Sequence, residues 1–175
     1  MQQQHIHHNW DMTYEEIQYE SHYRPNMMEW LKLKSVMREG WVRAGVNNPE
    51  SVAAHSWGMA LLAMHHCPEN IDKMRVIEMC LVHDLPEIIV GDLTPHDDTS
   101  NKHEDEVRAM KEIAPQWLEY FEEYEENETD EAKFVKYLDK LDMALMARLY
   151  ENEQGLDLNE FIVSARKIIG ETNLN

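Results

Sequence analysis

The amino-acid sequence predicts an all-α protein of roughly seven helices. Apolar residues recur at helical spacing along most of the chain, whereas the one strand-like cluster, Ile88-Ile89-Val90, is too short to begin a sheet. The length of 175 residues suits one domain, and 43% apolar residues are enough to fill a packed core.

The first predicted helix, residues 27–38, carries apolar residues at helical spacing and ends at Gly40, which suits a left-handed C-terminal cap. A loop over residues 41–50 follows, because this stretch holds two asparagines, a glycine and a proline. Ser51 is a favourable N-cap and begins the second helix, which stops before Pro68.

Further helical segments follow along the chain, and a loop at residues 91–95 separates two of them because it contains glycine, aspartate and proline. The predicted helices after the first cover residues 51–66, 71–83, 101–113, 115–126, 130–151 and 157–169.

The two ends of the chain differ in character. Residues 1–25 are predicted to be a peripheral N-terminal leader, and residues 26–170 a single domain. The leader contains His5, His7 and His8, but irregular histidine and glutamine at a terminus is more typical of a solvated leader than of a metal-binding tail.

Charge and composition exclude several classes of function. The formal net charge of −18 disfavours binding to nucleic acid, since like charges repel. The longest apolar run, residues 59–64, is far too short to cross a membrane. Cys67 and Cys80 form no CxxC pair, which fits a reducing compartment, so we expect a cytoplasmic protein. The GxxxxGK, GxGxxG, GxSxG and HExxH motifs are absent from the sequence.

Two histidines fall on faces of helices that point into the core. His83 follows Val76, Met79 and Cys80 at offsets of seven, four and three residues, which places all four on one stripe. His55 has the same relation to apolar residues four and seven positions later. Either histidine alone is more typical of a hydrogen-bonded core residue than of a ligand.

The helix over residues 130–151 adds two inward carboxylates to these histidines. Val135, Asp139, Asp142 and Met146 lie at offsets of 0, 4, 7 and 11 on one face. Burying a carboxylate costs several kcal/mol unless a cation compensates it, so an inward aspartate beside an inward histidine indicates a metal. The alternative for either aspartate is a salt bridge on a solvated face, and periodicity does not choose between the two.

The order of these residues resembles the H...HD...D signature of the HD-domain metal-dependent phosphohydrolases. Within that family the segments GWVRAGVNNPESVAAHSWGMALLAM, LVHDLPEIIVGDLTP and EAKFVKYLDKLDM resemble the 5′-deoxynucleotidase group of HD-domain-containing protein 2 and the YfbR-type enzymes. The likeness covers about Glu29 to Glu151, which is most of the chain.

The resemblance implies an all-helical HD-domain fold, a homodimer, and hydrolysis of a small-molecule deoxyribonucleoside 5′-monophosphate to deoxynucleoside and phosphate. It also implies one divalent metal ion, held by His55, His83, Asp84 and Asp139, and it ranks Asp139 ahead of Asp142 as the fourth ligand. Imidazole and carboxylate ligands suit Mn, Co, Fe, Ni, Zn or Mg, so the sequence leaves the identity of the ion open.

Four more residues match positions that relatives use for catalysis or for binding the nucleotide. Glu87 and Asp92 match acidic positions around the attacking water and the sugar end of the substrate, and Trp41 and Arg43 match a loop that holds the nucleotide. Three of them have a structural alternative: Glu87 suits the first turn of a helix, Asp92 suits a turn, and Trp41 suits a core anchor.

The sequence departs from the family pattern at two places. Relatives commonly carry arginine at the position of Ala44 and an acid at that of Ala54. These differences motivate a second hypothesis, a noncatalytic HD module that binds a nucleotide or serves as a scaffold. A third hypothesis keeps an enzyme that hydrolyses another nucleotide phosphoester.

Overall fold

The computed structural model describes residues 26–170, so the predicted leader over residues 1–25, with its three histidines, lies outside the described residues. Every regular element in residues 26–170 is a helix, and Met37 and Ser51 form an isolated antiparallel bridge. The prediction of an all-α protein is confirmed. The predicted domain bounds remain a prediction.

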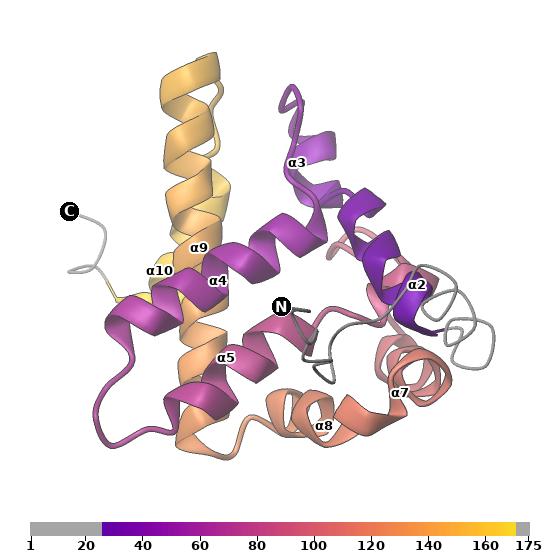
Figure 1. The fold of residues 1–175 in the computed structure, drawn as a ribbon. Helices are drawn as coiled ribbons and strands as arrows, with labels where there is room; N and C mark the ends of the chain where they lie inside the picture. Colours follow the sequence, from indigo (N-terminus) through magenta and orange to yellow (C-terminus); the bar gives the residue numbers. More distant parts are fainter. Residues whose placement is uncertain (1–25, 171–175) are drawn as a thin grey trace, which may run out of the picture.

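Figure 1 shows the helices in the order of the chain. They are α2 (Asn26–Trp30), the 3-10 helix η1 (Leu31–Ser35), α3 (Glu39–Arg43), α4 (Val52–His66), α5 (Lys73–Val82), α6 (Glu87–Val90), α7 (Lys102–Ile113), the 3-10 helix η2 (Pro115–Trp117), α8 (Leu118–Glu126), α9 (Asp130–Gln154) and α10 (Asn159–Ile169).

The sequence prediction is wrong in detail for the first helix and for the loop that follows it. Residues 27–38 do not form one helix, because Val36 turns to an extended conformation and its carbonyl accepts the N–H of Val52 at 2.8 Å. The expected loop over residues 41–50 instead contains the second half of α3. Gly40 lies inside α3 rather than capping a helix, and a Cβ there would meet the Phe161 ring at 3.3 Å.

The other long helices agree with the sequence prediction to within a few residues. Ser51 caps α4 through its side chain, and Thr129 caps α9 in the same way, because each accepts the N–H three residues later. The Ile88-Ile89-Val90 cluster, which resembled a strand, belongs to the short helix α6.

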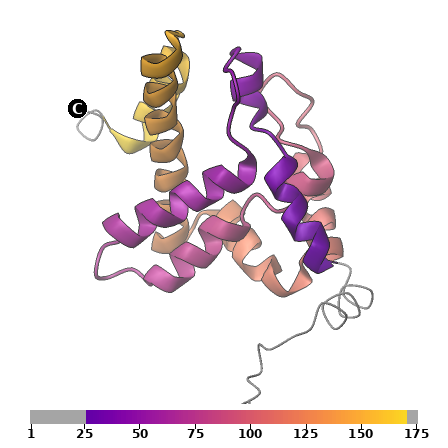
Figure 2. The same cartoon turned by 45° about the horizontal axis from the view of Figure 1, so that its top comes forward.

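Helix α9 organises the packing because it contacts α4, α5, α8 and α10. Figures 1 and 2 show α4 and α5 side by side across α9, with α10 along its other side. Met59, Met79, Val135 and Leu138 are fully buried where α4, α5 and α9 meet. The same three helices therefore bring residues far apart in the sequence to one place.

Candidate metal centre

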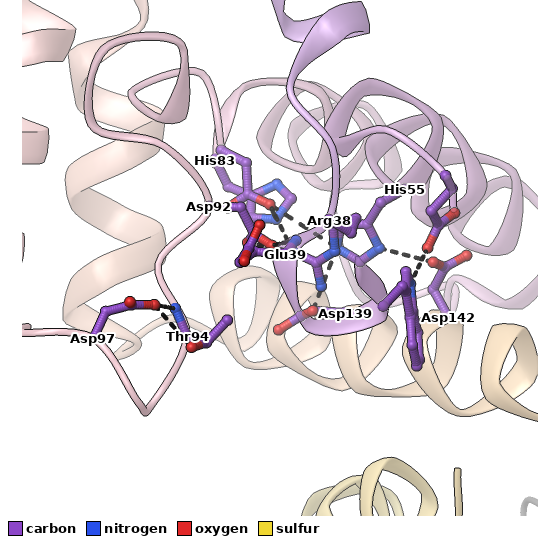
Figure 3. A network of polar contacts seen from close by, with 12 residues as sticks. Arg38, Glu39, His55, His83, Asp92, Thr94, Asp97, Asp139 and Asp142 are labelled. Atoms are coloured by element: carbon purple, nitrogen blue, oxygen red, sulfur yellow. Dashed lines mark hydrogen bonds and ion pairs between the residues drawn. The ribbon is translucent and has the colours of Figure 1, made fainter. Parts of the chain in front are cut away.

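Three packed helices bring two histidines and three aspartates close together, with aspartates on both sides of the His55 ring. His55 lies in the first turn of α4, His83 and Asp84 follow directly after α5, and Asp139 and Asp142 project from α9. Figure 3 shows the His55 ring between the carboxylates of Asp139 and Asp142. The two histidine side chains are almost completely buried, and the ring centroids lie 5.8 Å apart.

The Nε2 atoms of both histidines face the same carboxylate. Asp84 Oδ2 lies 3.1 Å from Nε2 of His83 and 4.0 Å from Nε2 of His55. One ligand atom from each of these three residues lies within 4.8 Å of the other two, which fits a set of donors around one cation. The predicted His55, His83 and Asp84 are thus brought together.

The Nδ1 atoms of the two rings have partners on the opposite side. Nδ1 of His55 lies 2.8 Å from Oδ2 of Asp142, and Nδ1 of His83 lies 2.9 Å from the carbonyl oxygen of Cys80. When each Nδ1 donates its proton to such an acceptor, Nε2 carries the lone pair that a metal requires.

The unpaired polar atoms also fit a metal. Nε2 of His55 has no hydrogen-bond partner among the described residues, although it is buried. A buried polar atom without a partner is costly, and a divalent cation would satisfy it. The donor set of imidazole nitrogens and carboxylate oxygens on this chain therefore fits the divalent ion that the sequence predicts.

The two predicted fourth ligands occupy different sides of His55. Asp139 Oδ1 lies 3.4 Å from Nε2, on the side of Asp84, and its other oxygen pairs with Lys140 at 3.0 Å. Asp142 lies on the Nδ1 side. The group of three ligand atoms within 4.8 Å does not include Asp139, but Asp139 is the aspartate on the side of the candidate cation position.

Charges shift the pKa values of this group strongly. Burial and Arg38 favour the neutral form of His55, but the neighbouring carboxylates of Asp139 and Asp142 prevail and raise its pKa to about 9. Burial likewise opposes ionisation of Asp84, but His83 and Arg38 hold the pKa of that carboxyl well below its usual range. In the metal-free protein, protons bound by the site and the positive charge of Arg38 compensate the negative charge of the buried carboxylates.

Arg38 is a site residue that the sequence analysis missed. Its guanidinium lies 3.2 Å from Asp92 and 3.8 Å from Asp84, next to a cavity of about 680 Å³ that these residues help to line. The sequence placed Arg38 at the end of an amphipathic helix, where a cation is unremarkable. Only the pairing of residues 36–38 with the chain before α4 turns it inward.

Glu87 is buried at the start of α6 and also lines the cavity. Its Oε2 has no hydrogen-bond partner among the residues that the structure describes. Burial first, and then the charges of Asp84 and Asp92, raise the pKa of Glu87 to about 11. In the absence of a cation this carboxyl carries a proton at neutral pH.

Both carboxylate oxygens of Asp92 have a bonding partner. Oδ1 pairs with Arg38, and Oδ2 accepts the backbone N–H of Glu39 at 2.5 Å (Figure 3). Asp92 therefore ties the loop after α6 to the start of α3 and holds Arg38 beside Asp84.

The two residues predicted to bind the nucleotide lie on one wall of the cavity in different settings. Trp41 is buried, packs against Tyr150 and Phe161, and donates its indole N–H to Glu50 at 3.0 Å. Trp41 is thus a core anchor as well as a wall residue. Ala44 lines the same cavity.

Arg43 is half-exposed at the rim of the cavity. It donates to Thr94 at 2.7 Å and to Asp97 at 2.6 Å, and it pairs with Glu39 at 3.1 Å. Arg43 therefore links α3 to the loop at residues 94–97.

Comparisons with known proteins identify a matching family and related chains. A family model described as HD domain matches residues 31–174. The chain is 40% identical over 111 residues to the 5′-deoxynucleotidase HDDC2 of Dictyostelium discoideum, a match that covers 51% of this chain and 58% of the relative. The chain spans about half the length of the curated relatives it matches.

Solved structures resemble a larger share of the chain. The PH0347 protein from Pyrococcus horikoshii OT3 superimposes with a TM-score of 0.75 and 33% identity, covering 86% of this chain and 90% of that one. A predicted metal-dependent phosphohydrolase from Magnetospirillum magnetotacticum MS-1 gives a TM-score of 0.63 with 25% identity, covering 90% and 86%.

Proposed function

The chain belongs to the HD-domain family, and from that premise we propose that it is a metal-dependent phosphomonoesterase of the 5′-deoxynucleotidase type. The reaction would hydrolyse a deoxyribonucleoside 5′-monophosphate to deoxynucleoside and phosphate. One observation carries the proposal: Nε2 of His55, Nε2 of His83 and Oδ2 of Asp84 converge where a ligand-sized cavity is lined by His83 and Asp84. The curated relatives are named 5′-deoxynucleotidases, which supports the substrate class.

The residues proposed to hold the ion are His55, His83, Asp84 and Asp139. Mn, Co, Fe, Ni, Zn and Mg all accept such ligands. When bound, a divalent ion polarises a phosphoryl oxygen and lowers the pKa of a water molecule.

Glu87 and Arg38 supply the chemistry that the chain itself provides around the phosphate. Glu87 lies buried at the cavity beside Asp84, and a carboxyl positioned there can donate a proton to a leaving 5′ oxygen. Arg38 places a fixed positive charge beside Asp84, where it can stabilise negative charge on phosphoryl oxygens. Asp92 would act by holding Arg38 in place.

Trp41 and Arg43 would bind substrate from the wall formed by α3. The buried Trp41 gives this wall a rigid apolar face, on which a base or sugar can pack. Arg43 would contribute by keeping the loop at residues 94–97 against α3, since its donors already bind Thr94 and Asp97.

Two further properties belong to the proposal. We infer a homodimer and a cytoplasmic location from the resemblance and the cysteine pattern stated above. Within residues 26–170, no helix combines the length and the apolarity needed to cross a membrane.

The experiment that tests the proposal is a phosphate-release panel. Purified protein is loaded in turn with Mn²⁺, Co²⁺, Mg²⁺ or Zn²⁺ and incubated with ribo- and deoxyribonucleoside 5′-monophosphates. We expect multiple turnovers on deoxyribonucleotides with at least one ion. The rate should fall about 100-fold or more after chelation or in His83→Ala. Nucleotide binding without turnover under every condition would favour the noncatalytic module instead.

A further inference from the structure

We propose that Asp142 and Gly58 act as a pair that orients His55, so that Asp142 is a positioning residue and not a metal ligand. The inference rests on the proposed function in one respect, that a divalent cation binds at His55, His83 and Asp84. The inference concerns Asp142 on α9 and Gly58 on α4. Because the two residues are in close contact, they determine which nitrogen of His55 faces the ion.

The contact between Asp142 and His55 has the geometry of a buried hydrogen bond. Oδ2 of Asp142 lies 2.8 Å from Nδ1 of His55, and the two side chains are about 10% and 1% exposed. This separation is typical of a charge-assisted N–H to carboxylate bond. The carboxylate is therefore the acceptor that places the proton on Nδ1.

A proton on Nδ1 determines what the other nitrogen can do. A neutral imidazole has one N–H, so Nε2 keeps its lone pair when Nδ1 is the donor. Nε2 of His55 points toward Asp84 and Asp139 and has no hydrogen-bond partner among the described residues. Asp142 thus leaves a free donor pair on the side where the other candidate ligands lie.

Gly58 makes room for the carboxylate that does this. A Cβ built on Gly58 would lie well within 3.0 Å of Oδ1 of Asp142, closer than Cβ atoms approach oxygen in proteins, and 3.3 Å from its Cγ. Gly58 is in the middle of α4 and is not among the described residues with positive φ. The backbone therefore does not require a glycine here, and a helix interior disfavours one.

The spacing of the two partners of Asp142 explains the arrangement. His55 and Gly58 are three residues apart on α4, so they lie on one face of the helix, one turn apart. One carboxylate oxygen contacts the His55 ring while the other occupies the space that a side chain at position 58 would fill. The close approach of Asp142, rather than the backbone conformation, is therefore the structural reason for a glycine at position 58.

The same residues also offer a second candidate cation position, on the Nδ1 side of His55. Glu50, His55 and Asp142 each offer a ligand atom within 4.8 Å of the others, so a cation could bind on the Nδ1 side. The contacts argue against it, because Asp142 already bonds Nδ1 directly and an oxygen of Glu50 accepts the indole N–H of Trp41. This reading becomes one of the outcomes of the test below.

The test measures binding of Mn²⁺ alone by calorimetry and the protonation of His55 by nitrogen-15 NMR in the Zn²⁺-loaded protein. We expect a slowly exchanging proton on Nδ1 of His55 in the wild type and its loss in Asp142→Ala. Asp142→Ala should weaken Mn²⁺ binding about 10- to 100-fold, the usual effect of removing a carboxylate behind a ligating histidine. Asp142→Asn keeps an acceptor of the same size, so it should lose less.

The Gly58→Ala variants test the pairing and supply the matched control. Gly58→Ala alone should weaken Mn²⁺ binding, because the new methyl displaces the carboxylate. The double variant Gly58→Ala with Asp142→Ala should bind Mn²⁺ as Asp142→Ala does, since the methyl then has nothing to displace. A melting curve recorded for each variant checks that the variant is folded before its Mn²⁺ affinity is compared with that of the wild type.

Three results would overturn the inference. Unchanged Mn²⁺ affinity in folded Asp142→Ala would remove the positioning role, and loss as complete as in His83→Ala would make Asp142 a ligand on the Nδ1 side. Losses that multiply in the double variant would disprove the pairing. Failure of the proposed function is separable, since wild-type protein that binds Mn²⁺ as described but releases no phosphate would remove only the activity.

Discussion

Each imidazole of the candidate metal centre uses its two nitrogens for different purposes. Nδ1 contacts an acceptor of the protein, which is Asp142 for His55 and the Cys80 carbonyl for His83. Nε2 of both rings faces Asp84. This division fixes the direction of each ring before any ion binds, which is how second contacts around a ligand raise affinity for a metal.

The sequence could predict these inward histidines but could not resolve the aspartates. The apolar neighbours of His55 and His83 at helical spacing indicate a buried face, and both are buried. Asp139 and Asp142 share one face of α9, so periodicity treats them alike. Their separation depends on which side of the His55 ring each reaches, and this is set by how α4 packs on α9.

Glu87 leads to a prediction about pH at the scale of a single residue. Its pKa in the folded protein is raised to about 11, so the folded state binds a proton that the unfolded chain loses above about pH 4.5. The stability that this group contributes is therefore fully present below that pH and is lost as the pH rises. Glu87→Gln carries no such proton and should escape the loss.

The measurement is urea unfolding of metal-free wild type and Glu87→Gln at pH 5 and pH 8. We expect the variant to exceed the wild type by about 1 to 3 kcal/mol at pH 8 and by much less at pH 5. An advantage of the variant that does not change with pH would show that Glu87 is not held protonated by its surroundings.

At the scale of an element, α9 is the helix against which several of the others pack. It packs against four other helices and carries two of the three aspartates of the candidate metal centre. Its start and course follow from sequence signals that are local, namely the Thr129 cap and apolar residues at helical spacing. The region around α3 was predicted poorly, because residues 36–38 pair with the chain before α4, and such long-range pairing has no periodic signal.

Two leucines of α9 test this view of its packing. Leu138 is fully buried between α4, α5 and α9, whereas Leu145, two turns further along, is 44% exposed. Leu138→Ala should lower the free energy of unfolding by about 2 to 5 kcal/mol. Leu145→Ala is the matched control and should change it by about 0.5 kcal/mol or less. Equal losses in urea unfolding would contradict the packing described here.

At the scale of the whole molecule, the net charge of −18 opposes the approach of the negatively charged phosphate that the site is proposed to bind. A protein with this charge repels a phosphate dianion at a distance. Arg38 lies beside Asp84 at the cavity, and a divalent ion there would add two more positive charges. The local field of the site, rather than the net charge, then governs binding of the substrate.

The balance of charges predicts how the whole protein responds to metal. The negative charges of the Asp84 and Asp139 carboxylates beside His55 and His83 are compensated when a cation binds, so the folded state should be stabilised. Mn²⁺ at 100 times its dissociation constant should add about 2.7 kcal/mol to the free energy of unfolding and raise Tm. His83→Ala should lose most of this gain in a thermal-shift measurement, and an equal gain in both proteins would assign the effect to binding elsewhere.

The proposed function depends on one ion binding between His55, His83 and Asp84. Crystals of the protein grown with Mn²⁺ test it directly, because the anomalous scattering of manganese locates the ion independently of any assumption about the site. We expect one strong peak in contact with Nε2 of His55, Nε2 of His83 and a carboxylate oxygen of Asp84, with Asp139 as the fourth protein ligand. A peak on the Nδ1 side of His55 between Glu50 and Asp142, or peaks confined to surface carboxylates, would contradict it.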